Sequence, residues 1–159
     1  IGTKHQSGKY IESKNYQLLY DRGEWIIYQK VSNIKDSKIF YLEKNGSIIS
    51  PIHLKGQIDN EPIIDKSNPF VESFDATKLH FPLKLRKWTN GDCIQPLGMS
   101  GQKKVSDILI DKKVNLNTKN NVFVLLSKND IIWVIGYVMS EKFKITKTSK
   151  KFYRVENSK

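Results

Sequence analysis

The chain has 159 residues, with 27 Lys and Arg against 16 Asp and Glu, a net charge of +11 and a pI of about 9.6. It holds no run of about 18 apolar residues and no signal-peptide pattern, which excludes a membrane-spanning helix and gives no sign of export. Its single cysteine, Cys93, excludes an internal disulfide and fits the reducing cytoplasm. Because the first residue is Ile1 rather than Met, we expect a fragment of a longer protein.

The positive charge is concentrated in the second half of the chain. Residues 1–79 hold 11 Lys and Arg and 10 Asp and Glu, whereas residues 80–159 hold 16 and 6, a net charge of +10. A basic half of this kind favours a polyanionic partner, most simply nucleic acid. The alternative interpretation is a solvated lysine surface that serves solubility.

The first half reads as a series of short strands after a polar lead-in over residues 1–9. Residues 10–19 and 24–30 are rich in β-forming residues and flank a turn at 21–23. Residues 25–28 are apolar on both faces, which predicts a strand covered on both sides. Residues 38–43 and 47–52 predict a hairpin, with Asn45 and Gly46 supplying positive φ values. Residues 55–69 predict a loop with one edge strand, and residues 70–79 a short strand followed by a turn.

The second half alternates more clearly. Over residues 79–86, Leu79, Phe81, Leu83 and Leu85 share one face, and Pro82 indicates an edge or a bulge. Residues 122–127 and 131–138 are almost wholly apolar and predict a core hairpin around 128–130. Residues 142–155 predict a last strand with Phe143 and Ile145 inward. The expected fold is α+β and mainly β, with antiparallel hairpins packed as a sandwich-like sheet core and one or two short helices.

A glycine-bearing loop at residues 96–104 interrupts these strands. Gly98 and Gly101 let the backbone approach a partner closely, and Lys103 and Lys104 follow them. The helical spacing of Val105, Ile108, Leu109 and Lys112 predicts a short helix, with Ser106 as its N-cap. Lysines beside free helical N–H groups favour an anion such as phosphate. The P-loop pattern of nucleotide hydrolases does not fit this loop.

The sequence offers little catalytic chemistry. His5, His53 and His80 are widely spaced and form no metal-ligand pattern. Asp107 and Asp111 share a helix face and could form a metal or acid–base pair. The simpler interpretation is that Asp107 complements the helix dipole and Asp111 orients a lysine. We therefore predict no catalytic residues and no bound cofactor in this chain.

Several other side chains have roles that the sequence predicts or leaves open. Trp25 and Trp133 lie in apolar runs and are expected in the core, whereas Trp88 either stacks on a base or caps the core. Met99 either packs against a ribose or base or plugs the core beneath its loop. Asp92, which follows Gly91, is expected to fix a turn.

Two blocks of the sequence resemble a known family. Residues 86–113 follow the string RxxxxGDxxxPxGMxGxKKxSDxxxDxK, and residues 133–136 with 141–146 resemble the closing strands of the same family. The resemblance is to the C-terminal region of bacterial tRNA(Ile)-lysidine synthetases, over residues 75–159 and more weakly over 1–74. The chain departs from the family pattern at Val138, Ser140 and Lys142, which removes an expected Arg–carboxylate pair and weakens the case for RNA contact by residues 136–141.

The resemblance implies a role without catalysis. Members of that family use ATP to attach lysine to the wobble cytidine of an isoleucine tRNA with a CAU anticodon. Their chemistry lies in an N-terminal ATP-pyrophosphatase domain with an SGGxDS loop, which this sequence lacks. The resemblance therefore implies a substrate-binding domain at 75–159, preceded by a β-rich segment at 1–74 that could share its fold. The domain at 75–159 would hold the tRNA body and acceptor stem, while ATP, Mg²⁺ and lysine would bind to the N-terminal catalytic domain.

The residues expected to contact RNA combine the motif with the basic half. Backbone phosphates are assigned to the following side chains: Arg86, Lys87, Lys103, Lys104, Lys112, Lys113, Lys142 and Lys144, with Lys147, Lys150, Lys151 and Arg154 beyond them. The motif loop contributes Gly98, Met99, Gly101, Ser106 and Asp107. The alternatives are a free-standing RNA-binding module and a structural plate that forms a homodimer through its strand edges.

Overall fold

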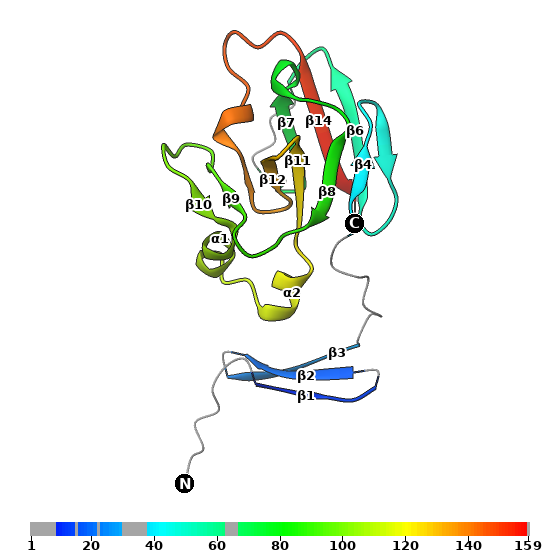
Figure 1. The fold of residues 1–159 in the computed structure, drawn as a ribbon, viewed down its shortest axis with the longest axis vertical. Coiled ribbons are helices and arrows are strands. Elements are labelled where there is room, and N and C mark those ends of the chain that lie inside the picture. The colour runs from blue at the N-terminus through cyan, green and yellow to red at the C-terminus, as the bar shows by residue number, and fades with distance from the viewer. Residues whose placement is uncertain (1–8, 15, 22, 30–37, 63–66, 159) are drawn as a thin grey trace.

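The structure, a computed structural model, describes residues 9–14, 16–21, 23–29, 38–62 and 67–158, and two antiparallel sheets form its main body (Figure 1). The five-stranded sheet has the order β13-β12-β11-β8-β4, and the four-stranded sheet β5-β6-β14-β7. The first comprises β4 (Phe40–Leu42), β8 (Leu83–Lys87), β11 (Phe123–Ser127), β12 (Asp130–Val134) and β13 (Val138–Met139). The second comprises β5 (Gly46–Ile48), β6 (His53–Asp59), β7 (Val71–Asp75) and β14 (Phe152–Ser158). The prediction of a mainly β, α+β fold is confirmed.

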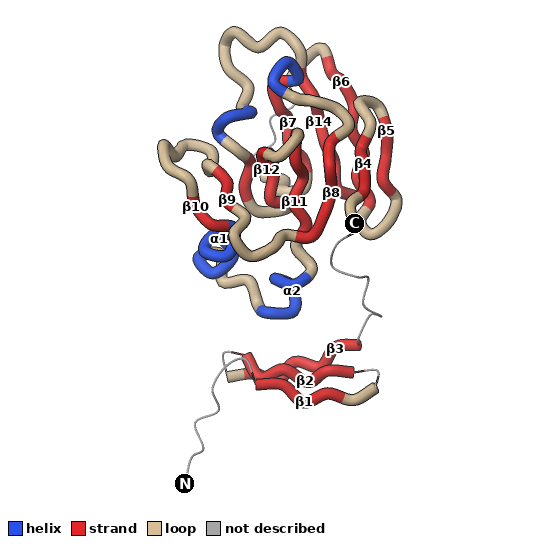
Figure 2. The backbone as a smooth tube through the Cα atoms, in the orientation of Figure 1, coloured by secondary structure: helices blue, strands red, loops and turns tan. Residues whose placement is uncertain are grey.

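The five-stranded sheet is buried on both faces. In β11, Phe123 and Leu125 join the core shared with the four-stranded sheet, while Val124 and Leu126 join a second core on the opposite face. The second core is completed by helix α1 (Val105–Asp111), drawn in blue beside the sheet in Figure 2. Alternate residues of a strand point to opposite faces, so an unbroken apolar strand requires this double cover.

Several strand predictions for the second half are confirmed. Ser127 pairs with Asp130 across a turn in which Lys128 has a φ of 54°, so β11 and β12 form the expected hairpin. Leu79, Leu83 and Leu85 are buried on one face and Phe81 packs against the same core. Phe143 is buried, but the last strand is shorter than predicted: the 3-10 helix η2 (Glu141–Phe143) and a loop precede β14.

The predicted hairpin over residues 38–52 is wrong. β4 pairs with β8 in one sheet, whereas β5 pairs with β6 in the other, so the turn between them is a corner that carries the chain across the sandwich. Neither Asn45 nor Gly46 has a positive φ. The Asn45 side chain instead accepts a hydrogen bond from the backbone N–H of Ile58, 3.1 Å away.

The loop predicted at residues 55–69 is also partly wrong, because β6 is an interior strand between β5 and β14. Its Gly56, which suggested a loop, lies beneath the ring of Tyr153. A Cβ at this position would stand 1.9 Å from the Tyr153 hydroxyl oxygen. The glycine is therefore required by a close approach of a side chain inside the sheet.

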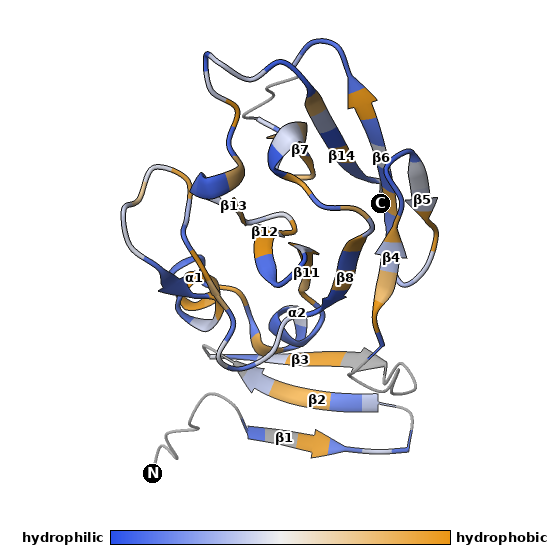
Figure 3. Cartoon of the chain, turned by 45° about the horizontal axis from the view of Figure 1, so that its top comes forward, coloured by the Kyte–Doolittle hydropathy of each residue, from blue (hydrophilic) through white to orange (hydrophobic). Residues whose placement is uncertain are grey.

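Residues 9–29 form a separate three-stranded antiparallel sheet of β1 (Lys9–Glu12), β2 (Tyr16–Asp21) and β3 (Glu24–Gln29). A turn closed by Ser13 and Tyr16 divides the first predicted run into two strands. Trp25 and Ile27 are 46% and 70% exposed, so the prediction of a doubly covered strand with a core tryptophan is wrong. Figure 3 shows hydrophobic segments on all three strands. The lead-in at residues 1–8, with His5, lies outside the described residues.

Candidate nucleic-acid interface

The end of β8 is fixed to the motif by an ion pair between Arg86 and Asp92. The guanidinium donates from Nη1 to Oδ2 at 2.7 Å and from Nη2 to Oδ1 at 2.9 Å, and the N–H of Thr89 donates to Oδ2 at 2.8 Å. Burial would raise the pKa of Asp92, but the bonds from Arg86 and Thr89 outweigh it and hold that pKa below its ordinary value. The prediction that Asp92 fixes a turn is confirmed, and Arg86 is engaged within the protein.

The glycine loop is tied to the second motif block, about forty residues further along the chain. The N–H of Gly98 donates to Glu141 Oε2 at 2.8 Å, and the N–H of Leu97 donates to the Met139 carbonyl at 3.0 Å. The N–H of Glu141 returns a bond to the Gln95 carbonyl at 2.9 Å. The bond from Gly98 and the partner Lys144 lower the pKa of Glu141. Glu141 is not among the predicted site residues, although its place in the second motif block was a signal for such a role.

The loop presents apolar tips to solvent. Gly98 has a φ of 82°, a conformation that favours glycine, and no atom lies within 4 Å of the position where a Cβ would stand. Leu97 and Met99 on either side of it are 49% and 47% exposed. The core plug proposed for Met99 is therefore wrong, and its packing against a ribose or base stays a prediction.

The lysines beside α1 are of two kinds. Lys103, in β10 (Lys103–Lys104), forms an ion pair with Asp111, as expected of a carboxylate that orients a lysine. Lys104 and Lys112 are exposed, and within the described residues no ion pair engages either. Ser106 is not the N-cap: the helix begins at Val105, and the Ser106 hydroxyl donates to Asp107 at 3.1 Å.

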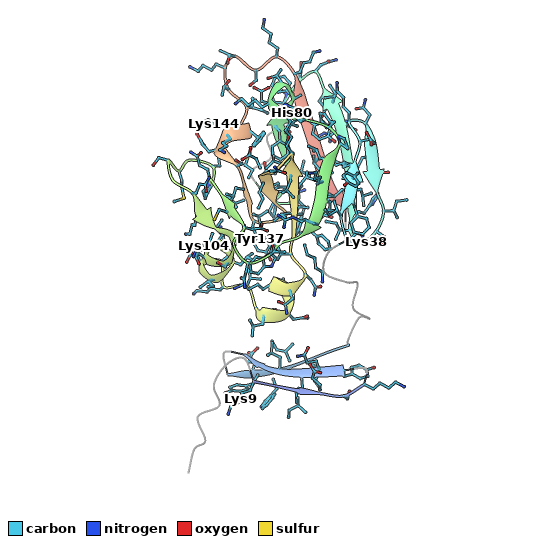
Figure 4. All side chains as sticks on the ribbon, in the orientation of Figure 1. Lys9, Lys38, His80, Lys104, Tyr137 and Lys144 are labelled. Carbon is cyan, nitrogen blue, oxygen red and sulfur yellow. The ribbon has the colours of Figure 1, made fainter. Side chains whose placement is uncertain are left out.

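The other predicted contacts are spread along the chain. Lys87 ends β8, and Lys113 follows α1 with a φ of 54°. Lys142 pairs with Asp130 at 3.1 Å, and Lys144 pairs with Glu141. Arg154 pairs with Asp59 at 2.8 Å and with Glu156. Figure 4 shows Lys104 and Lys144 on the same side of the molecule, the side that also carries the loop between β9 (Cys93–Ile94) and β10.

Trp88 caps the second core. Its indole N–H donates to the Lys119 carbonyl, 2.6 Å away, at the end of α2 (Leu116–Asn120), and its ring packs against the second core. The Lys119 ammonium lies 5.4 Å from the ring centroid, a cation–π contact. Of the two interpretations of Trp88, the core cap is confirmed.

Neither a metal centre nor a membrane span is found within the described part of the chain. No three His, Cys, Asp or Glu side chains there are grouped to hold a metal ion. No described helix has both the length and the apolar character needed to cross a bilayer.

Comparison with known proteins places the motif in a domain family. Residues 83–156 match the family model of the TilS substrate C-terminal domain, and this part of the chain belongs to that domain family. A crystal structure of a TILS C-terminal domain superposes with a TM-score of 0.65 at 17% identity, covering 76% of this chain and 97% of that one, so the fold is shared.

The relatives define the protein family more closely. A tRNA(Ile)-lysidine synthase of Parabacteroides distasonis is 34% identical over 151 residues, 92% of this chain and 34% of its own length. One of Clostridium tetani is 30% identical over 162 residues, 96% of this chain and 34% of its own length. The chain thus belongs to the tRNA(Ile)-lysidine synthase family and represents its C-terminal region. It spans about a third of the length of these relatives.

Proposed function

We propose that this chain is the tRNA-binding C-terminal part of an ATP-dependent ligase that attaches lysine to the wobble cytidine of an isoleucine tRNA. The observation that carries the proposal is the exposed glycine loop, which Glu141 and the Met139 carbonyl fix beside Lys104, with Lys112 at the far end of α1. The relatives that match the chain are named tRNA(Ile)-lysidine synthases, which supports tRNA as the substrate.

In this proposal the interface positions the tRNA and does not decode its sequence. The exposed lysines of β10 and the end of α1 contact backbone phosphates of the tRNA body or acceptor stem, and such contacts fix register and orientation. A-form RNA is recognised through shape, phosphates and 2′-hydroxyl groups, which suits lysines that project from the surface. The apolar tips of Leu97 and Met99, about half exposed, pack against a ribose or a terminal base.

The chemical step is assigned to another part of the protein. ATP, Mg²⁺ and lysine bind in an N-terminal catalytic domain outside this chain, and the enzyme acts in the cytoplasm. The described residues contribute binding energy and orientation. Orientation of a bound substrate is itself a large part of catalysis, because it replaces an encounter in solution by a fixed geometry.

A structural role is the second candidate function. The β1–β3 sheet exposes Ile11 and Ile27 by 63% and 70%, together with half of Tyr16 and Trp25. Such an apolar face favours contact with a second copy of the chain, that is, a homodimer. Analytical ultracentrifugation distinguishes the two candidates, because the structural candidate requires self-association of the chain and the proposed function does not.

A salt titration of tRNA binding tests the proposed function. Log affinity for an isoleucine tRNA transcript should fall steeply with log salt, and the transcript should bind more tightly than a duplex DNA of similar charge. Replacing Lys104 and Lys112 by Gln should reduce the slope by about 0.7 to 0.9 per lysine that contacts a phosphate. The control carries Lys44→Gln and Lys55→Gln, two exposed lysines in the nearly neutral half. Equal effects of the two pairs would refute the assignment.

A further inference from the structure

A second basic element lies in the loop between η2 and β14, the orange trace at the top of Figure 1. Lys147, Lys150 and Lys151 are all exposed, and within the described residues no ion pair engages any of them. This distinguishes them from Lys103, Lys142 and Lys144, which pair with Asp111, Asp130 and Glu141. The loop therefore concentrates three uncompensated positive charges within five residues.

The loop is folded by its own hydroxyl groups. The N–H of Ser149 donates to the Thr146 carbonyl at 3.1 Å, and the N–H of Thr146 donates back to Ser149 Oγ at 3.0 Å. The Thr146 and Thr148 hydroxyl oxygens lie 2.9 Å apart. These bonds close a tight turn whose backbone is ordered before any ligand arrives, which reduces the entropy lost on binding.

A buried carboxylate anchors this turn to the end of β7. Asp75 is 4% exposed, and its Oδ2 accepts from Ser149 Oγ at 2.6 Å. Its Oδ1 accepts from the N–H and the hydroxyl of Thr77 at 3.0 and 2.6 Å, at the start of η1 (Ala76–Lys78). Burial alone would raise the pKa of Asp75, but the hydrogen bonds from Ser149 and Thr77 hold it below its ordinary value.

Backbone contacts complete the attachment. The N–H of Ala76 donates to the Lys151 carbonyl at 3.0 Å, and the Lys78 ammonium donates to the Lys144 carbonyl at 3.2 Å. Both ends of the lysine loop are thus fixed to η1. The Lys78 ammonium also lies 4.0 Å from Asp75 Oδ2, and its positive charge offsets the negative charge of this carboxylate.

We propose that residues 146–151 form a second phosphate-binding element, which Asp75 and Ser149 position, and which contacts RNA backbone phosphates separately from the glycine loop and α1. The element rests on the proposed function, since its partner is the same tRNA. Ser149 and Asp75 are positioning residues. The three lysines make the contacts and add charge attraction without base discrimination.

The test compares two triple variants of the 159-residue chain in the tRNA salt titration. One carries Lys147→Gln, Lys150→Gln and Lys151→Gln. The control carries Lys14→Gln, Lys44→Gln and Lys55→Gln, three exposed lysines whose replacement removes the same charge. The first variant should reduce the salt slope by about 0.7 to 0.9 for each phosphate that these lysines neutralise in the parent chain, and the control should leave the slope near the parent value. Equal slopes in the two variants would overturn the inference.

The Lys104 and Lys112 variant separates this inference from the proposed function. If that variant weakens binding and the loop variant matches its control, the second element is refuted and the proposed function stands. If neither variant differs from its control, both are refuted.

A substitution that leaves the charge unchanged tests the positioning role. Ser149→Ala should weaken binding by about fivefold, because the lysines must then be ordered on binding, and Ser149→Thr should restore it. Parent-like affinity in a folded Ser149→Ala variant would refute the positioning role.

Discussion

The ion pair between Arg86 and Asp92 gives the sharpest prediction, because the sequence assigned Arg86 to RNA whereas the structure engages it within the protein. Asp92→Asn removes the negative charge that two guanidinium N–H groups approach at 2.7 and 2.9 Å. Arg86→Gln removes the opposite charge. We expect both to destabilise the fold, and Arg86→Gln to leave the salt slope of tRNA binding unchanged at temperatures where the variant is folded.

The magnitude follows from burial. The Arg86 and Asp92 side chains are 23% and 11% exposed. Breaking a fully buried pair costs about 3 to 5 kcal/mol, and a single hydrogen bond to a charged group contributes about 1.5 to 3 kcal/mol. Because Arg86 keeps some contact with water, we expect the free energy of unfolding to fall by about 2 to 3 kcal/mol. At roughly 4 °C per kcal/mol for a chain of this size, Tm should fall by about 8 to 12 °C.

The assay is thermal unfolding across pH, with Lys84→Gln as the matched control. Lys84 lies on the same strand and the same face as Arg86, and the substitution changes the charge equally. The lowered pKa of Asp92 means that the pair stabilises the fold above the ordinary carboxyl pKa of 3.8 and loses this effect as pH falls further. The deficit of Asp92→Asn should therefore persist at pH 7 and shrink below about pH 4. An Arg86→Gln variant with the parent Tm and weakened tRNA binding would refute the reasoning.

Three further predictions concern the fold and the loop. Gly56→Ala should lower the free energy of unfolding, measured by chemical denaturation, by about 3 kcal/mol, because its Cβ would meet the buried Tyr153 ring. Gly46 pairs with Gly56 on the neighbouring strand, and the control Gly46→Ala should lower it by less than about 1 kcal/mol. Equal losses in the two variants would contradict the packing argument. Burial raises the pKa of Glu72 to about 7, so its contribution to stability is present below pH 4.5 and is lost as pH rises through 7. Glu72→Gln should thus raise Tm at about pH 8 and have little effect at pH 4.5, and a gain independent of pH would contradict this. Met99→Ala should weaken tRNA binding without changing Tm or the salt slope, because an exposed tip contributes contact area and no charge; a fall in Tm would indicate a core role.

The structure changes which cations are free to meet a phosphate. Arg86, Lys103, Lys142, Lys144 and Arg154 all have carboxylate partners. The sequence shows where each charged residue lies along the chain but not which charged residues pair, because only the fold brings partners such as Asp130 and Lys142 together. Exposed ion pairs such as the one between Lys142 and Asp130 contribute little to stability, yet each reduces the charge offered to a polyanion. The exposed lysines at 104, 112, 147, 150 and 151, which no described carboxylate pairs, are therefore the better candidates.

The predictions of local structure succeeded where one strand pattern determined the outcome. The hairpin of β11 and β12 follows from two apolar runs around a short polar turn. The helix after the glycine loop follows from the spacing of Val105, Ile108 and Leu109. The predictions failed at Gly56, because a glycine occurs both in loops and at close contacts inside a sheet. Its composition indicated a loop, but Gly56 lies in an interior strand beneath Tyr153.

The sequence by itself determined the mainly β fold, the basic second half and the motif blocks that mark the family, because periodicity, charge and motif spacing are local properties of the chain. Only the tertiary structure decided that Glu141 clamps Gly98 and that β4 and β5 enter different sheets. It also showed that Asp75 anchors a lysine loop 74 residues further along. Contacts between distant segments depend on how the two sheets pack face to face. That packing depends on the apolar side chains that both cores bury together, and these come from segments far apart in the chain.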